Sequence, residues 1–337
     1  THPRNSCNFL YTLVLAIANG ALRRDQMNAM TDIVREPTIL DNAERRFPLD
    51  LGVRIPKIRR LFHAATRSQW DPRSDIEWDR IELSRYTDEQ LYAGREYWSR
   101  RAWAEYGAIS ESPAIQVRFC QDRHEPDLQL FFTIRSQEEA RHAEVCYLMA
   151  QKLGGYVEEP IKSKYEQSVS THGVRKMALD PNFSLDALIA ALVCAAEEVA
   201  FDTFKHLVEI TECPVATAVT QAIMRDEVRH CAFGWYYMDH RVPQMTPEEL
   251  DNVRDAVVVM IENVEFNGYH NAWLAPDSPA AAAEVHADKI TYEAGLGASI
   301  EELEKPVFIE TIVRLRRRMR KWGVELPPFS HPKLGTI

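Results

Sequence analysis

Two segments of the sequence carry the same pattern: Ser136-Gln-Glu-Glu-Ala-Arg-His142 and Arg225-Asp-Glu-Val-Arg-His230. In each segment a Glu precedes a His by three residues, giving the pairs Glu139 with His142 and Glu227 with His230. Residues three apart on an α-helix project from one face about one turn apart, so each pair can bind a single metal ion. One such pair arises easily by chance in a chain rich in Glu. Two pairs, each flanked by small or apolar residues, predict a centre for two metal ions.

The donor atoms of this predicted centre are carboxylate oxygens and imidazole nitrogens. This mixture suits iron or manganese better than a metal that prefers thiolates. Ionised carboxylates inside a helix bundle are unfavourable unless they are neutralised, and two cations shared among four Glu supply that neutralisation. We therefore expect two iron ions, with manganese as the alternative metal.

Apolar residues recur at helical spacing through most of the chain, and alternation typical of strands is nearly absent. The segments with this spacing are roughly 8–34, 87–120, 126–153, 184–210, 215–241, 247–271 and 300–322. Four long helices in series between about 87 and 241 predict a bundle. The long connection from Gly154 to Phe183 has the length that a ferritin-like crossover requires. We expect an all-α protein, a single helical domain over 1–337, with further helices before and after the bundle.

Three capping boxes predict where helices begin: Thr87 with Gln90, Thr246 with Glu249, and Ser299 with Glu302. In each, a hydroxyl lies three residues before a carboxylate or amide, and the two side chains can close the first helical turn.

A bundle site of this kind takes one further Glu from each of the other two helices. In the first helix, Glu105 lies about as far before the turn at 121–126 as Glu139 lies after it. Antiparallel packing therefore brings these two residues level. Glu111 is the alternative, but it adjoins Ser112-Pro113, where we expect an irregular helix. The sequence favours Glu105.

The third helix offers two adjacent candidates, Glu197 and Glu198. Adjacent helical residues are about 100° apart, so both cannot point at one centre. Glu197 lies nearer the apolar stripe of Val193 and Phe204, whereas Glu198 shares its face with Asp202. Periodicity leaves both residues open.

The segment from Arg225 to Cys231 resembles the corresponding segment of ribonucleotide reductase small subunits, bacterial multicomponent monooxygenase hydroxylases and the p-aminobenzoate N-oxygenase group. The resemblance covers about residues 87–241, and it implies a ferritin-like fold with a di-iron carboxylate centre that activates O₂. In the monooxygenases the third-helix Glu is followed by Phe at plus three and a polar residue at plus four. This chain repeats that pattern as Glu198, Phe201 and Asp202, so the resemblance favours Glu198 over Glu197.

The chain also departs from these families at two positions. Ribonucleotide reductase small subunits usually place a radical-forming Tyr four residues after the first His, where this chain has Cys146, with Tyr147 one step further. The N-oxygenase group carries an additional His four residues before the second Glu, where this chain has Ile223. The first departure disfavours radical storage, and the second means that N-oxygenation does not follow from the resemblance.

A metal-bound His usually donates its other N–H to a carboxylate. Asp226 and Glu138 each directly precede a predicted ligand, and we expect them to accept from the His of the opposite helix, His142 and His230 respectively. Ion pairing of these carboxylates with Arg229 or Arg141 is the alternative.

The composition excludes several other classes of protein. The formal net charge of −10, from 40 Lys+Arg and 50 Asp+Glu, disfavours a nucleic-acid-binding surface. Six cysteines without a C-x-x-C pair fit a reducing cytoplasm and exclude a rubredoxin-type iron site. The apolar stretch from Phe9 to Ala21 is too short and too interrupted to span a membrane. We expect a cytoplasmic protein without a membrane or nucleic-acid partner.

Together these features predict a non-haem di-iron oxygenase or oxidase that uses O₂ to hydroxylate, N-oxygenate or desaturate a small organic substrate. We expect electrons to come from an external ferredoxin or reductase, and we expect the chain to form a homodimer. The alternative is a non-catalytic or radical-storing dimetal protein of the ribonucleotide-reductase-small-subunit type.

Overall fold

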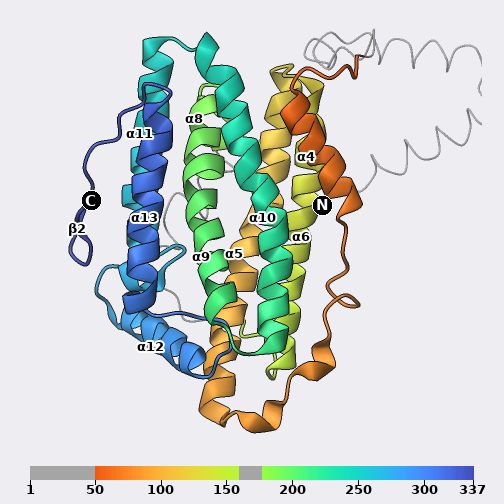
Figure 1. The fold of residues 1–337 in the computed structure, drawn as a ribbon, viewed down its shortest axis with the longest axis vertical. Coiled ribbons are helices and arrows are strands. Elements are labelled where there is room, and N and C mark those ends of the chain that lie inside the picture. Colours follow the sequence, from red (N-terminus) through yellow and green to blue (C-terminus); the bar gives the residue numbers. More distant parts are fainter. Residues whose placement is uncertain (1–49, 159–176) are drawn as a thin grey trace, which may run out of the picture. The chain divides into compact units, whose positions relative to one another are not determined.

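Long helices make up most of residues 50–158 and 177–337, which are the residues that the computed structural model describes. Leu51–Ile337 forms a compact unit of its own (Figure 1). The helix expected over 8–34, and the prediction of one domain over 1–337, fall wholly or partly outside the described residues. The all-α fold class is confirmed. None of the described helices combines the length and apolarity needed to cross a membrane.

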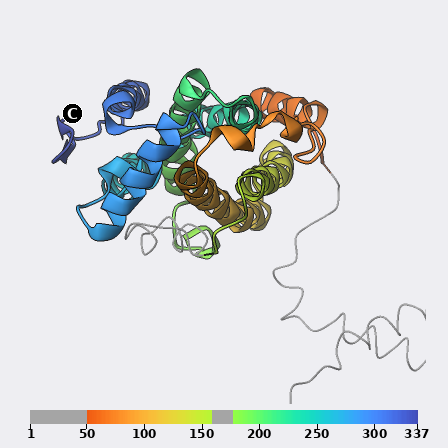
Figure 2. The ribbon, with the colours of Figure 1, turned by 90° about the horizontal axis from the view of Figure 1, so that it is seen from below.

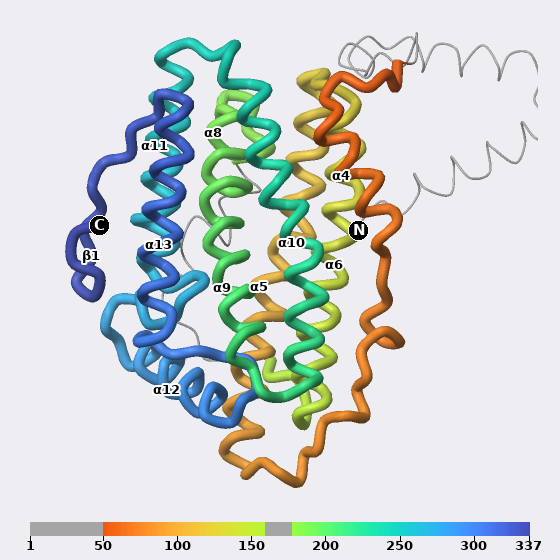
Figure 3. Tube along the Cα trace, in the orientation of Figure 1, coloured from red at the N-terminus to blue at the C-terminus, as the bar shows by residue number. Residues whose placement is uncertain are grey.

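The four-helix core lies where the sequence predicts it. Its helices are α5 (Asp88–Gln121), α6 (Pro126–Lys152), a composite third helix of α8 (Leu185–Ile189), η4 (Ala190–Ala196) and α9 (Glu197–Ile210), and α10 (Pro214–Arg241). α5 packs along α6, and α10 packs along α9. Figure 2 shows these helices end-on around a common centre, and Figure 3 shows how the green third helix lies beside the teal α10.

Further elements surround this core. They are α4 (Pro56–Arg67), α11 (Pro247–Asn263), α12 (Pro279–Glu293), α13 (Glu301–Arg320), the short 3₁₀ turns η1 (Trp78–Arg80), η2 (Leu83–Arg85), η5 (Val242–Gln244), η6 (Glu265–Asn267) and η7 (Ala272–Leu274), and a small hairpin of β1 (Ser330–His331) and β2 (Gly335–Thr336). α4 packs on α6 and α10, α12 on α5, and α13 on α9. The helix predicted over 247–271 ends early, at Asn263, and α4 and α12 were not predicted.

Two of the three predicted capping boxes are present. The Gln90 N–H donates to Thr87 Oγ1 at 3.2 Å, and the Thr87 N–H donates to Gln90 Oε1 at 3.0 Å. Thr246 and Glu249 form the same pair of bonds at the start of α11. The box predicted at Ser299 is wrong. α13 begins at Glu301 after an uncapped Ile300, and the Ser299 hydroxyl instead lies 3.0 Å from Nε2 of His206.

The third core helix contains a π-helical segment, η4, immediately before Glu197. α10 approaches this segment very closely at Gly234. A Cβ at that position would lie 2.5 Å from the carbonyl oxygen of Val193 and 3.0 Å from Sγ of Cys194. Only glycine permits this approach without a shift of the backbone.

Two apolar clusters divide the interior of the bundle along its length. One cluster contains Phe119, Phe131 and Phe233, and the rings of Phe131 and Phe233 stack at 4.7 Å. The other contains Trp98 and Met149 together with small residues of α10. On α5, α6 and α10 the predicted ligands fall between the residues of one cluster and those of the other, and on the third helix the two clusters meet at Val199 and Ala200, just after Glu197. The charged site therefore has apolar packing at both ends.

Candidate metal centre

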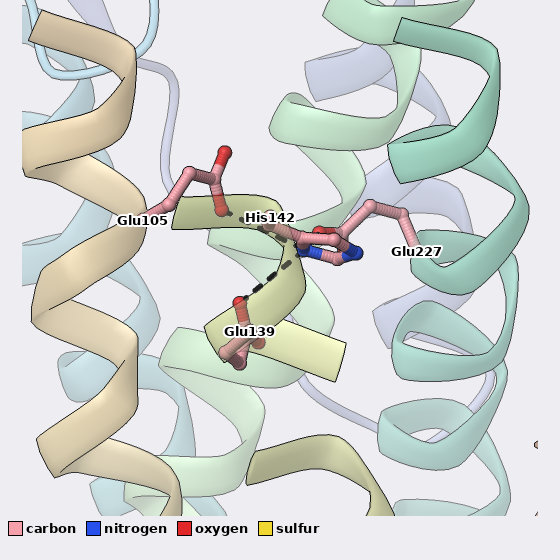
Figure 4. A group of neighbouring side chains, drawn as sticks. All are labelled: Glu105, Glu139, His142 and Glu227. Carbon is pink, nitrogen blue, oxygen red and sulfur yellow. Dashed lines mark ion pairs between the residues drawn. The ribbon is translucent and has the colours of Figure 1, made fainter. Parts of the chain in front are cut away.

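The four core helices bring six of the predicted ligand residues together. Five are the residues predicted without an adjacent rival, and the sixth is Glu197, one of the two candidates on the third helix. Potential donor atoms fall into two groups, each within 4.8 Å: Glu105, Glu139, His142 and Glu227 form the first group, and Glu139, Glu197 and His230 form the second. Figure 4 shows Glu105, Glu139 and Glu227 directed towards His142. Glu139 belongs to both groups, which places it between two cation positions. The cluster can therefore bind two metal ions.

Both imidazoles present Nδ1 to the carboxylates. His142 Nδ1 lies 3.2 Å from Glu227 Oε1, 3.6 Å from Glu139 Oε2 and 3.7 Å from Glu105 Oε2, yet it makes no hydrogen bond with any of them. His230 Nδ1 lies 3.0 Å from Glu227 and 3.4 Å from Glu139. A buried nitrogen facing three oxygens without a hydrogen bond fits a metal ligand, because a cation can accept all four lone pairs at once.

The electrostatics of the cluster are those of a site built for cations. Burial and the neighbouring carboxylate of Glu227 raise the pKa of Glu197 well above its usual value. Burial would lower the pKa of His230, but Glu227, Glu138 and Glu139 more than offset burial and raise that pKa to about 10. The Glu197 carboxyl and the His230 imidazole thus hold protons that divalent cations would replace.

Glu198, the preferred third-helix ligand, does not belong to either donor group in the structure. Its carboxylate points away from the cluster and accepts from Trp235 Nε1 at 2.7 Å, Arg314 Nε at 2.9 Å and Arg318 Nη1 at 3.1 Å. Glu197 is the residue that faces Glu139. The face that Glu198 shares with Asp202 is turned to α13, since Arg314 also pairs with Asp202. Asp202, the polar residue four positions after Glu198, therefore identifies the helix face that contacts α13 and not the face that carries the ligand.

Glu111, the alternative to Glu105, lies outside both donor groups. It lines the neighbouring cavity, and α5 continues unbroken through Pro113. The predicted irregularity at Ser112-Pro113 does not end the helix.

The outer nitrogens of the two imidazoles meet the expected carboxylates of the opposite helices. His230 Nε2 lies 2.9 Å from Glu138, and His142 Nε2 lies 3.4 Å from Asp226. The predicted alternative, pairing with arginine, is present as well, because Arg229 donates to both Glu138 and Asp226. These contacts are buried and fix which imidazole nitrogen faces the centre.

Trp70 and Arg141 extend this hydrogen-bonded network towards the segment before α5. Trp70 Nε1 donates to Asp226 at 2.8 Å, and Arg141 Nη2 lies 3.1 Å from the same carboxylate oxygen. The Arg141 guanidinium also lies over the Trp70 ring at 5.4 Å. Asp226 therefore connects an indole near the edge of the bundle to a predicted metal ligand.

A cavity of about 270 Å³ opens beside the cluster. Its inner wall contains four of the clustered carboxylates, and small or apolar residues such as Ala108, Ala200 and Phe204 line its middle. Its outer part is formed by residues 268–304, a region that the sequence did not mark as part of a site. The volume suits a small organic molecule.

Cys146, Tyr147 and Ile223 are the positions at which the sequence departs from the families that it resembles. Cys146 is fully buried, and burial raises the pKa of its thiol to about 12. Tyr147 is 43% exposed, and its hydroxyl accepts from Gln151, so it is not directed at the metal ligands. Ile223 is fully buried in the apolar cluster around Trp98.

Comparison with solved structures identifies the fold. An R2-like ligand-binding oxidase with an aerobically reconstituted metal cofactor after photoconversion matches with a TM-score of 0.61 and 14% identity, covering 80% of this chain and 94% of that one. An R2-like ligand-binding oxidase with an aerobically reconstituted Mn/Fe cofactor matches with a TM-score of 0.59 and 15% identity, covering 77% and 92%. This chain has the ferritin-like fold of the R2-like oxidases. No family model matches the sequence, and no curated protein matches it.

Proposed function

We propose that this R2-like chain is an O₂-activating dimetal oxidoreductase that oxidises a small organic substrate. The cavity beside the Glu/His cluster carries this proposal, since a substrate in it would lie against the carboxylates that hold the metals. Two iron ions, or one manganese and one iron as in the similar solved structures, would supply the redox chemistry of O₂ reduction. Hydroxylation, N-oxygenation and desaturation are the reaction types that such chemistry supports.

The residues of the chain would bind the metal ions, orient the imidazoles and exclude bulk water. Glu105, Glu139, Glu197 and Glu227 with His142 and His230 would hold the two ions. Asp226 and Glu138 fix the imidazoles by their contacts with Nε2. The apolar clusters at both ends keep bulk water from the centre, which strengthens the electrostatic interactions inside it.

Turnover would need electrons from outside the chain, and we propose a ferredoxin or a reductase as the donor, acting on a homodimer. Trp70 donates to Asp226, which lies 3.4 Å from His142 Nε2, and this series of contacts supports an entry route from the segment before α5. The five cysteines of the described residues are free thiols, which supports the proposed cytoplasmic location.

The competing function is a dimetal protein that stores a radical or has no substrate. The position of Tyr147 speaks against a tyrosyl radical like that expected in reductase small subunits, because its ring is exposed and its hydroxyl is engaged by Gln151. The two functions differ in how much O₂ each chain consumes.

The test loads metal-free protein with Fe²⁺ anaerobically and then supplies ¹⁸O₂, a ferredoxin with its reductase, and a low-molecular-mass cell extract. A catalyst consumes many O₂ per chain, and mass spectrometry detects products that carry ¹⁸O or have lost two hydrogens. Ala108→Phe, which enlarges a cavity-lining residue outside both donor groups, should keep both metals and abolish the product. Consumption limited to about one O₂ per chain in every extract fraction would refute catalysis and favour the storage function.

A further inference from the structure

One guanidinium lies between the carboxylates of the second donor group. Arg135 is on α6, one turn before Glu139, and its side chain is 2% exposed. Its Nη2 lies 2.8 Å from Glu139 Oε1 and also donates to Glu197 Oε1, while its Nη1 donates to Ser112 Oγ. A single nitrogen thus bridges the two carboxylates that, with His230, form this group.

The oxygen atoms that Arg135 engages are the ones that a cation in the second group would need. His230 Nδ1 lies 3.4 Å from Glu139 Oε1, which is the oxygen nearest Arg135. The first group is different, because His142 Nδ1 faces the other oxygen of Glu139, Oε2. The two donor groups therefore present opposite oxygens of one carboxylate, and Arg135 engages the oxygen on the side of His230.

The first group has a looser cationic neighbour. Arg101 Nη2 lies 3.3 Å from one oxygen of Glu105 and bridges no second ligand. Its guanidinium lies over the ring of Phe204 at 4.2 Å, beside the cavity. An ion bound by Glu105, Glu139, His142 and Glu227 would therefore require little movement of Arg101.

We propose that Arg135 ranks the two metal positions, so that the first ion binds between Glu105, Glu139, His142 and Glu227, and the second ion binds later and more weakly. The second ion must displace a buried guanidinium from Glu139 and Glu197, and the displaced positive charge stays near the incoming cation. Arg135 is thus a positioning residue that sets the order of metal loading. This inference rests on the proposed function, because both place two metals in this cluster.

Metal-free protein titrated anaerobically with Mn²⁺, with free Mn²⁺ followed by electron paramagnetic resonance, tests the ranking. We expect two classes of site whose Kd values differ by about tenfold or more. Arg135→Gln should lower the second Kd by about tenfold and change the first by less than about threefold. The matched control is Arg118→Gln, which removes another buried arginine, one that donates to the Ala178 and Phe183 carbonyls. Both Kd values should be unchanged in this control.

A second measurement needs no variant and so stands even if Arg135→Gln fails to fold. Crystals grown with less than one Mn²⁺ per chain should show anomalous density at His142 and not at His230. Two equal sites in the wild type, first occupancy at His230, or an unchanged second Kd in Arg135→Gln would each overturn the ranking while leaving the dimetal function intact. Protein that binds no Mn²⁺ at either position would overturn both.

Discussion

Single replacement of Glu197 or Glu198 by Ala should separate two properties that adjacent residues control. Glu197→Ala removes a carboxylate of the second donor group, so we expect metal binding to weaken by about tenfold or more. The free energy of unfolding of the metal-free protein should change by less than about 1 kcal/mol. Arg135 keeps its ion pair with Glu139, and the carboxyl that is removed is one whose ionisation burial disfavours.

Glu198→Ala should have the opposite effect. Its buried carboxylate accepts from Trp235, Arg314 and Arg318, and an indole N–H left without an acceptor costs about 1–3 kcal/mol. The two arginines are 26% and 36% exposed, so solvent screens their pairs and each adds at most about 1 kcal/mol. The sum, about 1–5 kcal/mol, corresponds to a fall in Tm of about 1–7 °C for a chain of this length. Metal stoichiometry should stay at two per chain.

The assay combines elemental analysis of the reconstituted variants with thermal unfolding of the metal-free proteins. Because the two replacements are chemically identical and one residue apart, each serves as the control for the other. If Glu198→Ala lost metal while Glu197→Ala kept two ions, the third helix would be rotated by about 100° relative to this structure, and our assignment would be refuted.

Three further perturbations test other parts of the structure. His142→Ala removes the imidazole of the first metal position, so elemental analysis should show metal content falling to one ion or fewer while circular dichroism remains helical; unchanged content would exclude His142 as a ligand. Gly234→Ala places a methyl group 2.5 Å from the Val193 carbonyl, so chemical denaturation should show a loss of about 1–3 kcal/mol, and an unchanged midpoint would contradict this close approach. Burial raises the pKa of Glu304 from 4.5 to about 7. Between these pH values the folded chain therefore holds a proton that the unfolded chain has lost. The free energy of unfolding should fall by about 2–4 kcal/mol as the pH rises through this range. Glu304→Gln should abolish this fall. Parallel curves of Tm against pH for the two proteins would refute the role of Glu304 in the pH dependence.

Much of the fold and most of the centre could be predicted because the relevant signals are local. Three-residue spacing on one helix determines that Glu139 and His142 share a face, and no tertiary contact changes this. The similar distances of Glu105 and Glu139 from their common turn likewise depend only on helical rise. The outer carboxylates Glu138 and Asp226 followed from the same geometry.

The register of the third helix could not be predicted from a periodicity of 3.6 residues. η4 is π-helical over Ala190–Ala196, and a π turn takes up more residues than an α turn. The faces defined before and after it are therefore out of phase. The choice between Glu197 and Glu198 then depended on Asp202, whose partner Arg314 is more than a hundred residues away in sequence.

Arg135 and the outer wall of the cavity were missed for a related reason. Arg135 follows the helical spacing of Glu139, one turn earlier, so its direction was available, but an arginine among metal ligands contradicts the usual pattern of a cation site. The cavity wall from 268 to 304 comprises short turns and α12, which lack the long helical periodicity that marked the bundle.

The crossed contacts of the two imidazoles have a consequence for how the protein assembles. His142 of the α5–α6 hairpin is oriented by Asp226 of α10, and His230 of the α9–α10 hairpin is oriented by Glu138 of α6. Neither hairpin contains a complete coordination sphere, so a fragment with one of them would lack both the donors and the groups that aim them. Docking of the hairpins must therefore precede tight metal capture during folding, and the kinetics of metal uptake by a refolding chain report that docking step.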